Sequence, residues 1–161
     1  MTLLNVDDFI ARLTAAFHDG DPHVAHKQVE GENVRALADQ YRALGAGDVA
    51  AAAATFADDV VLEIIGPRGA PFVGRWEGRD RVVEALGVNF SQVADMMPEV
   101  HTVTAQGDTV VVVARERGRY LPTGRWYDVH WVQVFRFRDG RLAHVREIID
   151  NASLLTAVEA G

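Results

Sequence analysis

The sequence predicts an α+β fold in which helices pack on one face of an antiparallel sheet. Helical patterns fill most of the first half of the 161-residue chain, and long strand patterns joined by tight turns fill the second half. Helices first and a strand meander last favour a sheet covered on one side, rather than a helix bundle or a parallel α/β sheet. The length suits one domain with a sizeable core.

Four segments in the first ninety residues place apolar side chains at helical spacing: 6–18, 33–44, 49–57 and 79–90. Asp21, followed by Pro22, and Asp48 are suited to begin the second and third helices. A β-branched run at 60–65 predicts a buried strand. The segment 66–78 holds four glycines and two prolines, so we expect a loop there.

Four strands follow, each separated from the next by turn residues. The expected strands are 99–105, 109–120, 126–137 and 142–149. The turns contain Gly107-Asp108, Pro122-Thr123-Gly124 and Asp139-Gly140. A short helix is expected to start at Asn151.

Composition narrows the class of protein. Hydrophobic residues make up 48% and charged residues 24%, as in ordinary globular domains. The net charge of −7 disfavours nucleic-acid binding, and no apolar run approaches the roughly 18 residues of a membrane span. With no cysteine, disulfides and thiolate chemistry are excluded. The first twenty residues lack a signal-peptide pattern, and we expect a cytoplasmic protein.

Segments 41–64, 72–86, 124–142 and 145–155 carry a resemblance that covers about residues 33–158. They read YRALGAGDVAAAAATFADDVVLEI, FVGRWEGRDRVVEAL, GRWYDVHWVQVFRFRDGRL and VREIIDNASLL. Their order resembles the nuclear transport factor 2-like superfamily, and within it the SnoaL-like polyketide cyclases and ketosteroid-isomerase-like proteins. The resemblance implies a curved sheet wrapped around helices that enclose a cone-shaped pocket. Residues 31–161 would form this domain, and residues 1–30 an additional helical extension that covers the pocket mouth or extends a dimer contact.

The resemblance also suggests which residues act. The catalytic aspartate of ketosteroid isomerases, a system known for two acids with separated pKa values, falls on Ile64, which cannot take a proton. The second acid falls near Gln133, and the tyrosine that binds the oxyanion falls near Tyr41. The SnoaL-like cyclases use an aspartate at the end of the last strand, which matches Asp150. Acid-base chemistry is therefore expected at that end of the sheet.

Strand parity sorts the side chains onto two faces, and the resemblance implies which of these faces lines the pocket. Glu147 shares a face with Val145 and Ile149, and the expected pocket face of the preceding strand contains Tyr127, Val129, Trp131, Gln133 and Phe135. The opposite face contains Asp128, His130, Val132, Val134, His144, Arg146 and Ile148. The resemblance implies that this face forms a homodimer contact. Val111, Val113 and Arg115 share one face, and Arg115 is the expected partner of Glu147 in a structural ion pair.

Each candidate has a structural alternative. Burial would raise the pKa of Glu147 and suit it to acid-base work, unless it is locked in an ion pair. Asp150 is either a general acid or base at the pocket rim or a helix N-cap. Tyr41 is either a hydrogen-bond donor to a ligand or a core aromatic. The remaining ligand-binding candidates, individually as consistent with plain packing, are Ile64, Phe72, Trp76, Val113, Arg115, Trp131 and Gln133.

The segment His18–His26 contains three histidines and two aspartates. Its spacing matches no standard zinc pattern, so a solvated loop with a helix cap is the favoured interpretation and no metal site is predicted.

Two functions remain open. The first is an enzyme that binds a small, apolar, oxygenated molecule and isomerises, cyclises or dehydrates it by removing a proton next to a carbonyl. Such chemistry needs no cofactor. The second is a non-catalytic ligand-binding or dimerisation module of the same fold.

Overall fold

The structure is a computed structural model that describes residues 24–159. Its elements, in chain order, are α2 (Val24–Gly45), α3 (Val49–Ala54), β1 (Phe56–Ile65), β2 (Gly74–Glu77), α4 (Arg79–Ser91), β3 (Val93–Gln106), β4 (Thr109–Tyr120), β5 (Arg125–Arg138), β6 (Arg141–Ile149) and α5 (Asn151–Val158). The predicted α+β class is confirmed.

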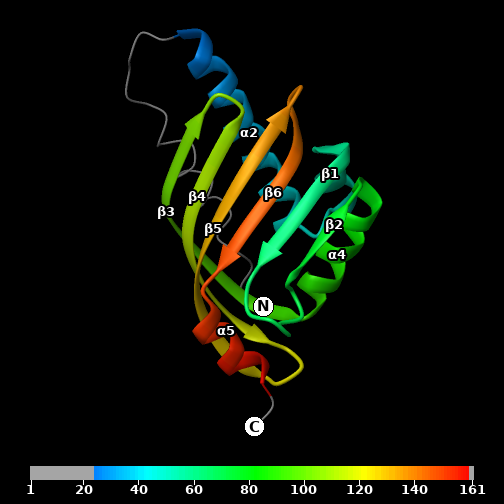
Figure 1. Cartoon of the computed structure of the whole chain (residues 1–161), viewed down its shortest axis with the longest axis vertical. Coiled ribbons are helices and arrows are strands. Elements are labelled where there is room, and N and C mark those ends of the chain that lie inside the picture. Colours follow the sequence, from blue (N-terminus) through cyan, green and yellow to red (C-terminus); the bar gives the residue numbers. More distant parts are fainter. Residues whose placement is uncertain (1–23, 160–161) are drawn as a thin grey trace.

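A single curved sheet of six strands organises the molecule, in the order β2-β1-β6-β5-β4-β3. Neighbouring strands are antiparallel except for β1 and β6, which run parallel. In Figure 1 the sheet faces the viewer, α2 lies behind it, α4 lies beside β2, and α5 follows the end of β6. The last strand in the sequence therefore occupies the middle of the sheet.

Tight turns set the register of the long hairpins. Gly107-Asp108 joins β3 to β4, and Asp139-Gly140 joins β5 to β6, as expected from the sequence. Asp139 and Gly140 both have positive φ angles, of 51° and 72°, a conformation that two-residue hairpin turns require and that Asp and Gly tolerate. The β4–β5 turn places Tyr120 opposite Arg125.

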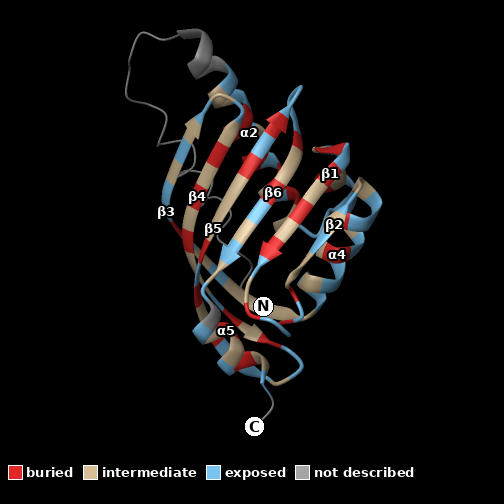
Figure 2. Ribbon diagram, viewed as in Figure 1, coloured by how far each residue is buried: buried red, intermediate tan, exposed pale blue. Residues whose placement is uncertain are grey.

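The core lies between α2 and the concave face of the sheet. Val34, Leu37 and Ala38 repeat along one side of α2 and are almost fully buried. Along the strands, buried residues alternate with more exposed ones, as Figure 2 shows. At its N-terminal end, α2 is held to the β3–β4 turn, because the amide of Gly107 donates to Glu30 and the side chain of Asn33 donates to the Gly107 carbonyl.

Several boundaries differ from the sequence expectation. Residues 74–77, expected in a loop, form the edge strand β2, and β1 starts at Phe56, where a helix was expected to continue. Strand β3 starts at Val93 and contains a bulge near Asp95, whose φ angle is positive. Such a bulge breaks the alternation from which strands are recognised.

Some predictions fall outside the described residues. The helix expected at 6–18 does so, as does the His/Asp cluster up to His23. Helix α2 runs without a break across the expected boundary between residues 30 and 31. None of the helices in the described part of the chain is long and apolar enough to cross a bilayer.

Candidate functional site

A cavity of about 180 Å³ lies between the concave face of the sheet and the helices α2 and α4. Most of its wall is apolar, including Ile64, Phe72, Val129 and Trp131. Its polar lining consists of Tyr41, Asn89, Glu116, Tyr127, Gln133 and Glu147. None of the described lining residues is basic. The carboxyl groups of Glu116 and Glu147 therefore share the cavity without a cationic side chain in its lining.

Glu147 is held in this cavity by a chain of hydrogen bonds. It is the register partner of Gln133 on β5, whose Nε2 donates to Glu147 Oε2 at 2.9 Å. The hydroxyl of Tyr41, from α2, donates to Gln133 Oε1. Three predicted residues from three different elements are thus brought together. On the other side of Glu147, its partner in β1 is Ile64, so the carboxyl lies beside the position from which a ketosteroid-isomerase aspartate is missing.

The cavity changes the acidity of Glu147. Burial is the main cause that raises its pKa from 4.5 to about 7, and the charge of Glu116 adds to this effect. The hydrogen bond from Gln133 opposes it, because it favours the ionised form. A carboxyl group with this pKa exchanges protons near neutral pH, as a general acid or base requires.

Glu116 is a second carboxyl group in the cavity, and the sequence interpretation missed it. Its Oε1 accepts a hydrogen bond of 2.7 Å from the hydroxyl of Tyr127. Burial raises the pKa of Glu116, and that hydrogen bond counteracts the rise. Gly118 leaves room for this contact, because a Cβ added there would overlap the ring and hydroxyl of Tyr127.

The position of Glu116 follows from the β4–β5 register. Glu116 pairs with Val129, and Tyr127 with Gly118, so even-numbered residues of β4 share the pocket face with odd-numbered residues of β5. Opposite residues of an antiparallel pair lie on the same face. The turn between β4 and β5 sets this register. A prediction that used the turn could therefore have placed Glu116 on the pocket face.

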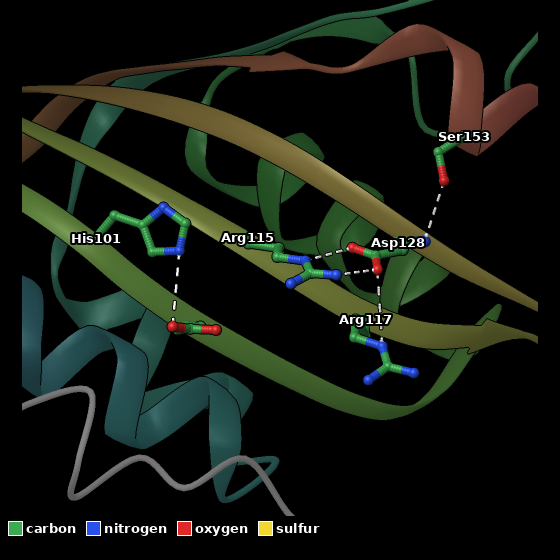
Figure 3. Close-up of polar contacts among 6 residues, drawn as sticks. His101, Arg115, Arg117, Asp128 and Ser153 are labelled. Carbon is green, nitrogen blue, oxygen red and sulfur yellow. Dashed lines mark hydrogen bonds and ion pairs between the residues drawn. The ribbon is translucent and has the colours of Figure 1, made fainter.

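Val113 and Arg115 were wrongly placed in the pocket, because they lie on the outer face of β4. Arg115 donates from Nε and Nη2 to the carboxylate of Asp128, and Arg117 approaches the same carboxylate at 3.8 Å (Figure 3). The predicted pair of Arg115 with Glu147 is therefore wrong. Arg115 holds the pKa of Asp128 below its usual range, mainly through these hydrogen bonds.

Asp150 and Trp76 also lie away from the cavity wall. Asp150 is exposed and begins α5, where its Oδ1 accepts a hydrogen bond from the amide of Ala152 at 3.2 Å. It therefore occupies the N-cap position that was its structural alternative. Trp76 pairs with Leu62 across β1 and β2 and packs against the core, with its ring over Gly74.

Residues 24–159 contain no cluster of side chains suited to hold a metal ion. Among them, no group of three or more His, Asp or Glu side chains converges as metal ligands do. The site that the structure does form has two carboxyl groups, two phenols and two side-chain amides inside an apolar cavity.

A family model for the SnoaL-like domain matches residues 34–145. The chain belongs to the SnoaL-like domain family. The match covers α2 from Val34 onward and the sheet through Val145 in β6, and so includes Tyr41, Glu116 and Gln133. No curated protein matches the sequence.

Solved structures place this SnoaL-like domain in the NTF2-like superfamily. An NTF2-like protein from Burkholderia xenovorans LB400 is 28% identical, with a TM-score of 0.70, and covers 80% of this chain and 96% of its own. A SnoaL-like polyketide cyclase from Jannaschia sp. CCS1 is 23% identical, with a TM-score of 0.72, and covers 89% and 99%. An LEH-like epoxide hydrolase from M. tuberculosis is 23% identical, with a TM-score of 0.63, and covers 79% and 89%. At these identities the last two show a shared fold.

Proposed function

We propose that this SnoaL-like domain is a cofactor-independent isomerase, cyclase or dehydratase in which Glu147 transfers the proton. The observation that carries the proposal is a carboxyl group with a pKa of about 7 in an apolar cavity. The substrate is a small, largely apolar molecule with a carbonyl oxygen, because the apolar wall favours carbon and the few polar groups fix orientation.

The proposed step starts with ionised Glu147. Its carboxylate removes a proton from the carbon next to the carbonyl, and the electron pair moves into an enolate whose negative charge lies on oxygen. Glu147, now neutral, returns the proton to another carbon to isomerise the substrate. In a cyclase, the enolate carbon instead attacks a second carbonyl carbon of the same substrate; the C=O π bond of that carbonyl breaks, and Glu147 gives its proton to the resulting alkoxide oxygen. In a dehydratase, the enolate expels a hydroxyl group from the β carbon, and that group leaves as water with the proton from Glu147. A buried site strengthens this chemistry because polar groups act in a low dielectric.

Tyr41 and Gln133 supply the hydrogen-bond donors nearest to Glu147. We propose that the substrate oxygen accepts from the Tyr41 hydroxyl in place of the Gln133 side-chain oxygen. The second donor of the Gln133 amide then also reaches the substrate oxygen. Ile64, Phe72 and Trp131 pack against the carbon skeleton, since all three line the cavity. Asp150 has no part in this step.

The named activities of the fold neighbours are consistent with acid-base chemistry in such a pocket. They include a SnoaL-like polyketide cyclase and an LEH-like epoxide hydrolase. Fold neighbours also differ widely in reaction, so the proposal rests on Glu147.

The test follows deuterium uptake at the carbon next to a carbonyl, by NMR in D₂O, over a panel of ketones. Wild-type protein is expected to accelerate exchange, and Glu147→Gln to slow it by about 10²- to 10⁴-fold, the usual contribution of a general base. Glu63→Gln is the matched control, because Glu63 lies on the outer face and pairs with Arg146 at 2.7 Å. Equal exchange in wild type and Glu147→Gln would refute the proposal.

A non-catalytic binding site is the second candidate. The hydrogen bonds from Tyr41 to Gln133 and from Gln133 to Glu147 favour it, because they satisfy the polar groups without a substrate. Ketones that bind without any exchange in the wild-type protein would support this candidate.

We also propose that two copies associate through the outer face of the sheet. This face exposes Trp126 by 56% and Ile148 by 47%, and exposed apolar surface can mark an interface. Ile148→Glu is expected to halve the mass measured by light scattering. Val88→Glu, on α4 and equally exposed, is the control.

A cytoplasmic location remains part of the proposal. The absence of cysteine fits a reducing compartment without requiring one. Cell fractionation checks it.

A further inference from the structure

We propose that a second apolar cavity beside the first holds the tail of an elongated ligand whose oxygenated head lies at Glu147. This inference rests on the proposed function for the position of the head. It adds the shape of the substrate: a carbonyl group at one end and a straight apolar chain of several carbons at the other.

The second cavity has a volume of about 240 Å³ and lies among the end of α2, α3, the start of β1, and α4. Its wall includes Val49, Ala52, Phe56, Val83 and Gly87, and no charged side chain occurs in its described lining. A polar or charged tail would find almost no hydrogen-bond partner there and would lose its hydration. The cavity therefore selects for hydrocarbon.

The two cavities are adjacent. Leu44, Leu86 and Phe90 line both of them, so the boundary between the cavities consists of apolar side chains from α2 and α4. Of these three side chains, Phe90 is 41% exposed. A ligand with its head at Glu147 reaches the second cavity by passing these three side chains.

Small residues keep the second cavity open. Ala52 of α3 and Gly87 of α4 stand at the cavity wall. A Cβ added at Gly87 would meet no atom within 4 Å, and its backbone angles suit any residue. Glycine is a poor helix former, so the local preference of α4 would favour a larger residue there. Gly87 is exposed and lines the cavity, so a larger side chain has room there.

The test uses the full-length chain and a series of phenyl alkyl ketones from acetophenone to octanophenone. Binding is measured by calorimetry, or by quenching of tryptophan fluorescence, since Trp131 lines the first cavity. For wild-type protein the affinity is expected to rise by about fourfold for each methylene group that leaves water. The rise ends when the tail fills the second cavity.

Two independent variants fill that cavity: Gly87→Leu and Ser91→Leu, both from α4. Each is expected to keep the affinity for acetophenone and to lose at least tenfold for octanophenone. Val88→Leu is the matched control, because Val88 lies on the same helix, is 54% exposed and lines neither cavity. Thermal melting checks that each variant is folded. One folded variant is enough for the test.

The proposal is overturned if wild-type affinity does not rise with chain length, or if folded variants keep the rise. Failure of the tail-site proposal can be told apart from failure of the proposed function, because the tail site is tested by binding and the function by deuterium exchange. Length-dependent binding that the two variants abolish, without deuterium exchange in wild type, would support the tail site and remove the catalytic role of Glu147.

Discussion

Carboxyl groups on the two faces of the sheet have pKa values shifted in opposite directions. On the outer face, Glu63 and Asp128 accept hydrogen bonds from arginines, which lower their pKa values. On the inner face, Glu116 and Glu147 have no basic neighbour among the described lining residues, and burial raises their pKa values. The difference shows that a carboxyl group becomes a candidate catalyst through its face and its partner, and not through its sequence neighbours.

Consecutive residues make the comparison sharper. Arg115 precedes Glu116 on β4, and Arg146 precedes Glu147 on β6. In both pairs the strand sends the arginine outward and the glutamate into the cavity. In each pair, the arginine forms an ion pair on the outer face, and the glutamate next to it has a raised pKa in the cavity.

The largest effect is expected when one pair is reversed. Exchanging the two residues, Arg115→Glu with Glu116→Arg, keeps the composition but brings a guanidinium into the apolar cavity. A buried charge without its partner typically costs about 3–5 kcal/mol, so the free energy of unfolding in urea should fall by that order. The exchange of Asp80 with Arg81, both exposed on α4, is the control. Equal losses in both would mean that the faces do not differ.

A smaller effect with an unusual sign is expected for Glu147→Gln. The folded pKa of about 7 lies above the ordinary 4.5, so the folded state binds a proton that the unfolded state has released. The resulting stability is present below pH 4.5 and lost as the pH rises through 7. At pH 8 the variant, which has no charge to bury, should therefore be more stable than wild type by on the order of 3 kcal/mol.

Urea unfolding at pH 4 and pH 8 checks this sign. Glu63→Gln should behave in the opposite way, because the pKa of Glu63 is lowered and its ion pair stabilises the fold above the unfolded pKa. A Glu147→Gln variant that is no more stable than wild type at pH 8 would contradict the raised pKa.

The smallest effect is expected at Asp150. Asp150→Ala removes the N-cap of α5 and should cost about 1 kcal/mol, whereas Asp150→Ser keeps a capping oxygen and most of the stability. Both variants should retain deuterium exchange. Loss of deuterium exchange in the stable serine variant would show that Asp150 takes part in proton transfer.

The sequence predicted the fold, and the strand faces of some candidate residues, for physical reasons. The Asp139-Gly140 turn joins β5 to β6 and keeps their alternation in phase, so Glu147 and Gln133 were placed on the correct face. Strand β4 gave no such guide, because Val110 to Val113 are apolar on both faces. Only its pairing with β5 decides that Glu116 points inward, and this pairing was not used.

Other misses arose where local pattern is weak. Strand β2 has four residues, and its glycine conceals the alternation. For Asp150, the sequence could not choose between the pocket rim and the N-cap, since both positions follow the last strand. That choice depends on the direction in which the chain leaves β6.

The order of the strands has a consequence for how the site forms. Strand β6 comes late in the chain but lies between β1 and β5, and its contacts with β1 join residues about eighty positions apart. Contacts between distant residues form slowly because a long loop must close first. Most residues of the pocket wall also precede Glu147 in the sequence, so they are synthesised before it. A chain that ends before β6 lacks both Glu147 and the strand that joins β1 to β5.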